Sequence, residues 1–90
     1  MWQLELKPRA VRVLAKLNPQ LQQRIRDFLD DLLANDNPRL KGEALQGPHG
    51  LWKYRVGDYR MIANIQDEQL TILVLKIGHR SHVYHKLPKP

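Results

Sequence analysis

The chain has 90 residues, a formal net charge of +6 and no cysteine, with 15 lysines and arginines against 9 acidic residues. This length predicts one domain spanning residues 1–90, which folds alone but is too small for a deep, enclosed active site. The absence of cysteine excludes a disulfide framework, a thiol nucleophile and a thiolate metal site, and it fits a reducing cytoplasm.

The N-terminal segment predicts a strand followed by a short helix. Apolar and polar residues alternate over residues 2–6, which is the period of a half-buried strand. Pro8 ends this run and suits the first turn of a helix. Val11, Leu14 and Leu17 then give that helix a short apolar stripe.

A second, longer helix is predicted to begin at Asn18-Pro19, because asparagine caps helix N-termini and proline is tolerated at the first helical position. The helix extends to about residue 35, where an Asp-Asn-Pro sequence ends it. One side of this helix is apolar and is assigned to the core: Leu21, Ile25, Phe28, Leu29, Leu32 and Leu33.

Residues 38–50 are rich in glycine and proline and predict an irregular connector. We expect Leu40 and Leu45 to anchor this connector to the core. Glu43 and His49 lie in it and could each reach a site from a loop, although an isolated loop glutamate is usually just solvated.

Residues 51–65 predict a β-hairpin that turns at Gly57-Asp58. A two-residue loop puts Arg55 directly opposite Arg60, so that Lys53, Arg55 and Arg60 project from one face. Like charges opposite each other destabilise a sheet, and an anion such as a phosphate would relieve the repulsion. The alternative is that both arginines are ordinary solvated surface residues.

After a polar loop, residues 70–77 predict a strand at the centre of the sheet or one covered on both faces. Gly78 lets the chain turn at the end of this strand. The segment GHRSHVY, residues 78–84, then presents four functional side chains near that edge: His79, Arg80, His82 and Tyr84.

Together these elements predict an α+β fold in which a strand and two helices precede a three-stranded antiparallel meander. Both helices are expected to pack on one face of the small sheet. The other face is expected to be open, with Lys53, Arg55 and Arg60 pointing from it.

The basic charge favours nucleic acid as the partner, with an acidic protein as the second choice. All 4 histidines lie in the C-terminal half of the chain, which is also the more basic half. No apolar run approaches the roughly 20 residues that cross a bilayer, so we expect a cytoplasmic protein that does not enter a membrane.

Lysine, arginine, histidine and tyrosine together suit the cleavage of a phosphodiester by a neighbouring 2′-hydroxyl, without a metal or other cofactor. Arginines stabilise charge on the five-coordinate phosphate, and a lysine or a histidine moves protons. Tyr84 could stack on a base or position a phosphate oxygen. The need for a 2′-hydroxyl restricts the substrate to RNA.

Two other chemistries fit the sequence less well. His79, His82 and His85 have a spacing that could suit a metal, but no cysteine or nearby carboxylate completes a zinc site. Ser81 lies between two histidines, yet nothing indicates the strained turn and oxyanion hole that a nucleophilic serine needs.

Three motifs carry a resemblance to a known family. They are L-x-G at residues 45–47, WKYRVGDYR at residues 52–60 and G-H-R-x-x-V-Y at residues 78–84. With the order of elements they resemble the RelE/ParE superfamily of toxins from bacterial and archaeal toxin–antitoxin systems, over nearly the whole chain.

Resemblance to the RelE branch implies a ribosome-dependent mRNA interferase. Such toxins enter the ribosomal A site and cut the mRNA codon there by 2′-hydroxyl attack, which leaves a cyclic phosphate. The resemblance also implies a cognate antitoxin of RelB type, expected to be acidic, that wraps the toxin and keeps it inactive.

The resemblance carries five catalytic assignments onto this chain. The basic pair of RelE toxins matches Lys53 and Arg55. Their phosphate-binding arginine matches Arg60, their second arginine matches Arg80, and their C-terminal stacking tyrosine matches Tyr84.

The general base is left open by the same comparison. RelE toxins have a lysine as the second member of the basic pair, whereas Arg55 cannot deprotonate at useful pH. Lys53, His79 or His82 would have to take that role. His79 lies where a lysine can occur in the family, and we assign His79 and His82 to substrate binding.

Two alternative functions use the same fold. A ParE-like toxin inhibits DNA gyrase without cutting nucleic acid, although such relatives generally lack the assembled basic and proton-transfer residues. A catalytically weak homologue would bind RNA without cleaving it, because basic charge alone gives affinity.

Overall fold

The computed structural model describes residues 1–47 and 50–88, so His49 lies outside the described residues. Its elements follow in the order β1 (Gln3–Leu6), α1 (Pro8–Lys16), α2 (Pro19–Ala34), the 3₁₀ helix η1 (Pro38–Lys41), β2 (Glu43–Ala44), β3 (Leu51–Val56), β4 (Tyr59–Gln66) and β5 (Thr71–His79). The predicted strand, two helices and meander are therefore confirmed. The predicted connector was wrong in part, because it contains η1 and β2.

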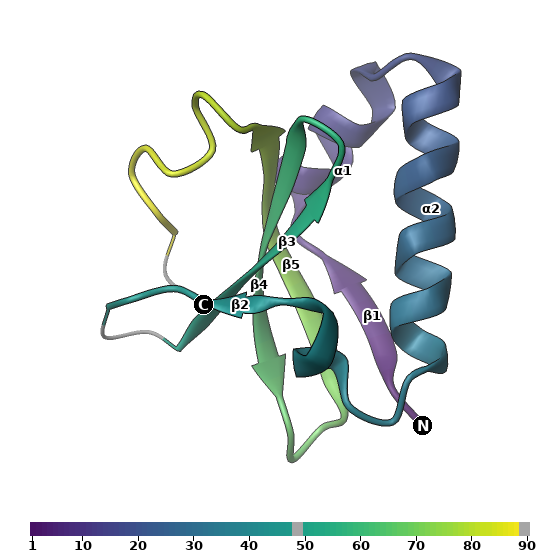
Figure 1. The fold of residues 1–90 in the computed structure, drawn as a ribbon, viewed down its shortest axis with the longest axis vertical. Coiled ribbons are helices and arrows are strands. Elements are labelled where there is room, and N and C mark those ends of the chain that lie inside the picture. The colour runs from purple at the N-terminus through teal and green to yellow at the C-terminus, as the bar shows by residue number, and fades with distance from the viewer. Residues whose placement is uncertain (48–49, 89–90) are drawn as a thin grey trace.

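The five strands form one mixed sheet in the order β1-β5-β4-β3-β2. β1 runs parallel to β5, and all other neighbouring strands are antiparallel. β5 thus has a partner on each side, as its apolar sequence predicted. Figure 1 shows the two helices on one side of the sheet and the C-terminal segment on the other.

The side of the sheet that faces the helices carries the larger core. α2 begins at the predicted cap, where Oδ1 of Asn18 accepts a hydrogen bond of 2.9 Å from the backbone N–H of Leu21. Three side chains of α2 are buried against the sheet: Ile25, Leu29 and Leu32. The apolar stripe predicted for this helix is therefore confirmed as core.

α1 packs through most of the predicted stripe, with Ala10 in place of Val11. Ala10 is fully buried, whereas Val11 is 50% exposed. Residues 10, 14 and 17 are four and three residues apart, so they share one face of the helix, and this face packs against the sheet. The assignment of Val11 to the core was wrong, while Leu14 and Leu17 do pack against it.

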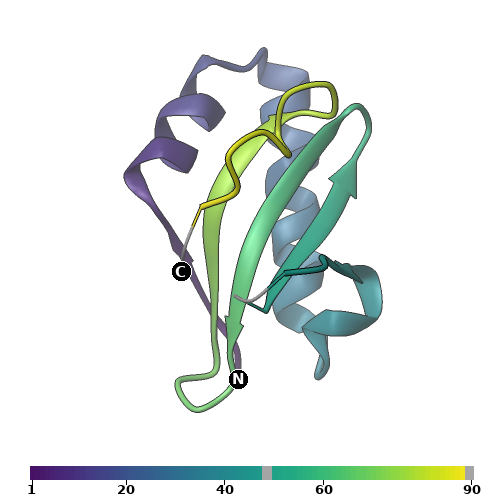
Figure 2. The same cartoon turned by 90° about the vertical axis from the view of Figure 1, so that its left-hand side faces the viewer.

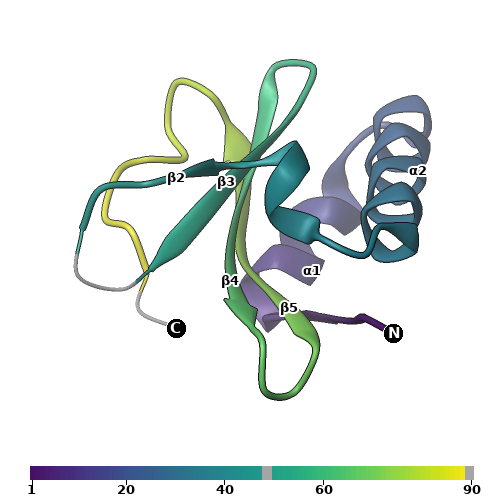
Figure 3. The same ribbon diagram turned by 60° about the horizontal axis from the view of Figure 1, so that its bottom comes forward.

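The opposite face of the sheet is not open along its whole length, which corrects the sequence-based expectation. A second buried cluster lies there, with Leu45 packed against it: Leu51, Ile62, Leu73, Leu75 and Val83. Figures 2 and 3 show the C-terminal segment crossing this face. Leu51, Lys53 and Arg55 are each two residues apart on β3, so their side chains lie on the same face of the sheet. The cations therefore lie on the face of the apolar cluster, farther along the strand.

Close packing against a glycine holds the C-terminal segment on the sheet. A Cβ atom added at Gly78 would lie 3.3 Å from Cβ of Val83, so Val83 occupies space that any other residue at position 78 would fill. Nζ of Lys76 also donates a 2.7 Å hydrogen bond to the backbone carbonyl of His85. Burial, with a smaller effect of nearby Arg9, lowers the pKa of this lysine.

No helix within residues 1–47 and 50–88 has the length and apolar content needed to cross a bilayer. Among the other expectations for the connector, Leu45 is partly buried as predicted. Leu40 was predicted wrongly, because it is 75% exposed on η1.

Candidate functional site

The β3–β4 hairpin has the predicted turn and register. Gly57 adopts φ 59°, the left-handed conformation that glycine favours in such turns. Arg55 pairs with Arg60, and Lys53 pairs with Ile62. The three cations Lys53, Arg55 and Arg60 therefore share one face at the end of the hairpin.

These cations converge on a small pocket of about 170 Å³. Two further residues line it, Lys41 from the end of η1 and Glu43 from β2. Sequence reasoning missed Lys41 and noted Glu43 only as a loop residue. The cross-strand pairing of Glu43 with Lys53 brings it to the pocket, and no local sequence signal reports such a pairing.

Contacts of η1 with the sheet position Lys41 and Glu43. The hydroxyl of Tyr54 donates a 2.8 Å hydrogen bond to the carbonyl of Pro38, and burial raises the pKa of Tyr54 to about 12. Arg39 donates two hydrogen bonds, of 2.9 and 2.6 Å, to the carboxylate of Asp67. The bonded guanidinium holds the pKa of Asp67 below its usual range. The Arg39–Asp67 pair thereby links η1 to the loop between β4 and β5.

Arg60 is fixed by the hairpin itself. Its Nη1 donates hydrogen bonds of 2.9 Å to the carbonyl of Gly57 and 3.0 Å to the carbonyl of Tyr59. Both bonds use Nη1, so the N–H groups of Nε and Nη2 take no part in them. The side chain is partly buried and thus held in place.

Lys53 links the pocket to the C-terminal segment. Its Nζ lies 3.4 Å from Oε2 of Glu43 and 5.6 Å from the centre of the Tyr84 ring. Lys53 thus forms an ion pair with Glu43 and a cation–π contact with Tyr84. The structure therefore brings Tyr84 beside Lys53, as the sequence-based site requires.

Arg80 lies beside the hairpin turn and does not line the pocket. Its backbone N–H donates a 2.8 Å hydrogen bond to the carbonyl of Asp58, and its Nε lies 3.8 Å from a carboxylate oxygen of the same residue. The side chain is 63% exposed.

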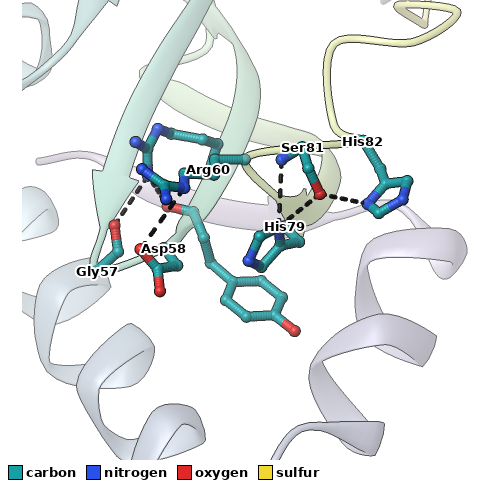
Figure 4. Close-up of polar contacts among 8 residues, drawn as sticks. Gly57, Asp58, Arg60, His79, Ser81 and His82 are labelled. Atoms are coloured by element: carbon teal, nitrogen blue, oxygen red, sulfur yellow. Dashed lines mark hydrogen bonds and ion pairs between the residues drawn. The ribbon is translucent and has the colours of Figure 1, made fainter.

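His79 and His82 form a separate cluster that is bridged by Ser81 (Figure 4). The backbone N–H of Ser81 donates to Nδ1 of His79, so that nitrogen carries no proton and also accepts the Ser81 hydroxyl at 2.7 Å. Nδ1 of His82 lies 2.7 Å from the same hydroxyl oxygen and must donate to it. Both rings are thereby tied to Ser81.

The histidine cluster does not join the pocket. The ring of His79 packs edge-on against Tyr59 with 5.7 Å between ring centres. Tyr59 belongs to the core on the helix side of the sheet, so His79 projects to that side. Within the described part of the chain, no three histidine or carboxylate side chains gather as metal ligands.

A family model decides the relationship of this chain to known proteins. The model for the ParE toxin of type II toxin–antitoxin systems, parDE, matches residues 4–84. The chain belongs to the ParE toxin family. The resemblance read from the sequence motifs is confirmed, and the protein is a toxin of type II toxin–antitoxin systems.

Two proteins similar to this chain are named as Rel toxins. The chain is 29% identical over 77 residues to Toxin RelG of Mycobacterium tuberculosis, which covers 86% of this chain and 88% of that protein. It is 26% identical over 90 residues to the mRNA interferase toxin RelE of Escherichia coli, covering 96% and 93%.

Solved structures of similar toxins share the fold of this member of the ParE toxin family. The RelBE2 toxin–antitoxin complex of Mycobacterium tuberculosis superimposes with a TM-score of 0.77 at 29% identity, covering 89% of this chain and 92% of that one. The archaeal RelE–RelB complex from Pyrococcus horikoshii gives 0.76 at 27% identity, covering 91% and 98%. The α+β arrangement is therefore the RelE fold.

Proposed function

We propose that the protein is a ribosome-dependent mRNA endoribonuclease that blocks translation by cutting mRNA through 2′-hydroxyl attack. The observation that carries this proposal is the convergence of Lys53, Arg55 and Arg60 on one pocket of the sheet. Cationic donors held at one point suit the charge that develops on a five-coordinate phosphate. The similarity to a RelE that is named an mRNA interferase supports the same reaction.

Each assigned residue has a role in the proposed reaction. Arg60, anchored by the hairpin, and Arg55 opposite it stabilise the phosphate that is attacked, and Arg80 binds a flanking phosphate from the turn. Tyr84, which is 39% exposed, offers its ring to a base. The attacking oxygen belongs to the RNA, so the reaction needs no metal-bound water.

His79 and His82 have a different place in this proposal. Their cluster lies outside the pocket and flanks Arg80, whose backbone N–H donates to the carbonyl of Asp58 in the hairpin turn. We assign them to binding RNA beyond the cleaved bond and not to the proton transfers at that bond. This assignment removes His79 and His82 from the three candidates for the general base that the sequence left open.

A cognate antitoxin is the inferred partner that keeps the toxin inactive. Two of the similar solved structures are complexes of a toxin with its antitoxin, the RelBE2 complex and the archaeal RelE–RelB complex. An acidic antitoxin suits a toxin with a net charge of +6, because complementary charge speeds association. Action on mRNA in the ribosome would place the protein in the cytoplasm.

Gyrase inhibition without cleavage is the second candidate function. One observation favours it, because the matching family model is that of the ParE toxin of parDE systems. Two assays on the wild-type protein separate the candidates. Primer extension on translated mRNA should show cuts at codon spacing, and a DNA supercoiling assay should show no inhibition. Inhibition of supercoiling with intact mRNA would replace the first candidate with the second.

A pair of arginine variants tests the pocket. Arg60→Ala should abolish cutting and growth arrest, since it removes a pocket guanidinium. Arg26→Ala is the matched control, because Arg26 is an exposed arginine of α2 outside the pocket, and it should cut like the wild type. Equal cutting by both variants would remove the pocket from the proposal.

A further inference from the structure

We propose that Glu43 is the general base of this nuclease and takes the proton from the attacking 2′-hydroxyl. The inference rests on the function proposed above and assigns one residue of the same pocket. Glu43 lies on β2, whose pairing with β3 aligns it with Lys53 across the strands. Its Oε2 lies 3.4 Å from Nζ of Lys53, and its side chain is 77% exposed and open to a substrate.

The composition of the pocket selects Glu43. Besides Glu43, the lining consists of four cationic side chains: Lys41, Lys53, Arg55 and Arg60. Protonated lysine and arginine donate hydrogen bonds and have no lone pair with which to accept a proton. A carboxylate is ionised at neutral pH and can accept one. Of the five lining residues, Glu43 alone needs no prior loss of a proton.

The histidines do not compete for this role. His79 faces Tyr59 on the helix side of the sheet, and its Nδ1 accepts hydrogen bonds from Ser81. His82 is tied to the same serine. Neither histidine lines the pocket in which the cations converge.

A structural role alone does not account for a carboxylate at this position. An exposed ion pair such as that of Glu43 and Lys53 contributes little to stability. A negative charge also opposes the binding of a phosphate, so a pocket that only bound RNA would work better without it. A base is the role in which that charge is useful.

The ion pair couples proton transfer to charge stabilisation. While Glu43 is ionised, its charge offsets that of Lys53. Once Glu43 has taken the proton, the attacked phosphate gains negative charge, and the full charge of Lys53 becomes available to stabilise it. Lys53 thus orients the base first and stabilises the phosphate afterwards.

Glu43 takes the proton of the 2′-hydroxyl, the bond from the 2′-oxygen to phosphorus forms, and the bond from phosphorus to the 5′-oxygen breaks. The leaving 5′-oxygen takes a proton from water, and Glu43 returns its proton to the resulting hydroxide. The products are a 2′,3′-cyclic phosphate and a 5′-hydroxyl.

The test is single-turnover cleavage of mRNA on programmed ribosomes. Glu43→Gln keeps the shape of the side chain but cannot act as a base, so the rate should fall about 100-fold or more. Glu43→Asp keeps a carboxylate and should retain a rate within about tenfold of the wild type. Glu68→Gln, which changes an exposed glutamate of the loop after β4, is the matched control and should leave the rate unchanged.

A binding measurement separates catalysis from RNA binding. An mRNA with a 2′-deoxynucleotide at the scissile position cannot be cut, and Glu43→Gln should bind ribosomes carrying it at least as tightly as the wild type does. A rate for Glu43→Gln within threefold of wild type would overturn the assignment of Glu43 and leave the proposed nuclease standing. Loss of binding together with cleavage would overturn it too, because Glu43 would then only hold Lys53. A wild-type protein that does not cut would overturn both proposals.

Discussion

Arg55 and Arg60 lie directly opposite each other on β3 and β4, so two positive charges form a cross-strand pair at the end of the hairpin. Like charges in this arrangement lower the stability of a sheet. The two arginines differ in their contacts, because the guanidinium of Arg60 bonds to the hairpin carbonyls. Arg55 is exposed and has no such anchor among the hydrogen bonds of the described residues. Arg55 is therefore the member of the pair whose removal costs the fold least.

Arg55→Gln should separate stability from activity. Removal of the repulsion should raise the free energy of unfolding by about 0.2–1 kcal/mol. Cleavage of mRNA should fall, because one of the guanidinium groups that face the phosphate is lost. Urea unfolding and primer extension measure the two effects. Arg26→Gln is the control on α2, and a destabilised Arg55→Gln protein would show that the pair is not repulsive.

Arg60→Lys should lower both cleavage and stability, although the substitution keeps the positive charge. A lysine cannot make both carbonyl contacts of Arg60 and also present a planar pair of donors to a phosphate. We expect a loss of cleavage of about 10²-fold or more and a loss of stability of about 1 kcal/mol. Arg55→Lys is the matched comparison and should lose less stability. Near wild-type cleavage by Arg60→Lys would show that charge alone matters at this position.

The sequence could predict the hairpin because its signals are local. The glycine at the turn and the alternation along each strand fix the register, so the shared face of Lys53, Arg55 and Arg60 followed directly. The two helices were equally clear, since proline and asparagine mark their beginnings. These local rules explain why the fold class was predicted.

The rest of the candidate site depends on contacts between distant segments. β2 has only two residues, which is too short for a periodic signal, and its pairing with β3 brings Glu43 to the pocket. The C-terminal segment covers the sheet face opposite the helices because Val83 packs against Gly78. No sequence pattern in either segment predicts this contact. Arg80 and the histidines were assigned by motif, which gave their order in the chain but not the side of the sheet to which they point.

Gly78→Ala should loosen the C-terminal segment. The added methyl would meet Val83 at 3.3 Å, and Val83 is fully buried, so Val83 has to move by a few tenths of an ångström. We expect this movement to weaken the contact of the adjoining Tyr84 with Lys53. Val83→Ala removes two methyl-sized groups from the second core cluster and should cost about 1.5 kcal/mol. Both single variants should unfold at lower denaturant concentration and cut mRNA more slowly.

A double variant tests the same contact. In Gly78→Ala/Val83→Ala the smaller side chain makes room for the added methyl, so the loss of stability should be less than the sum of the two single losses. Additive losses would show that residues 78 and 83 act independently. The cycle is measured from urea unfolding of the four proteins.

Tyr54→Phe tests the support of η1, and its effect should depend on pH. The tyrosine is 1% exposed and donates a 2.8 Å hydrogen bond to the carbonyl of Pro38. Its loss should cost about 1 kcal/mol at pH 7. Burial raises the pKa of Tyr54 to about 12, above the value near 10 of an unfolded chain. Stability that requires the neutral phenol is therefore fully present below pH 10 and is lost as pH rises through about 12.

The stability difference between wild type and Tyr54→Phe should consequently shrink above pH 10, since only the wild type loses this contribution. Denaturant unfolding of both proteins at pH 7, 9 and 11 measures the difference, and comparison at each pH cancels the titration of all other groups. The same η1 segment carries Lys41 at its end, directly before the strand that holds Glu43. A loosened η1 should thus also slow cleavage at pH 7. A constant stability difference from pH 7 to 11 would show that the phenol of Tyr54 does not titrate differently in the folded and unfolded protein.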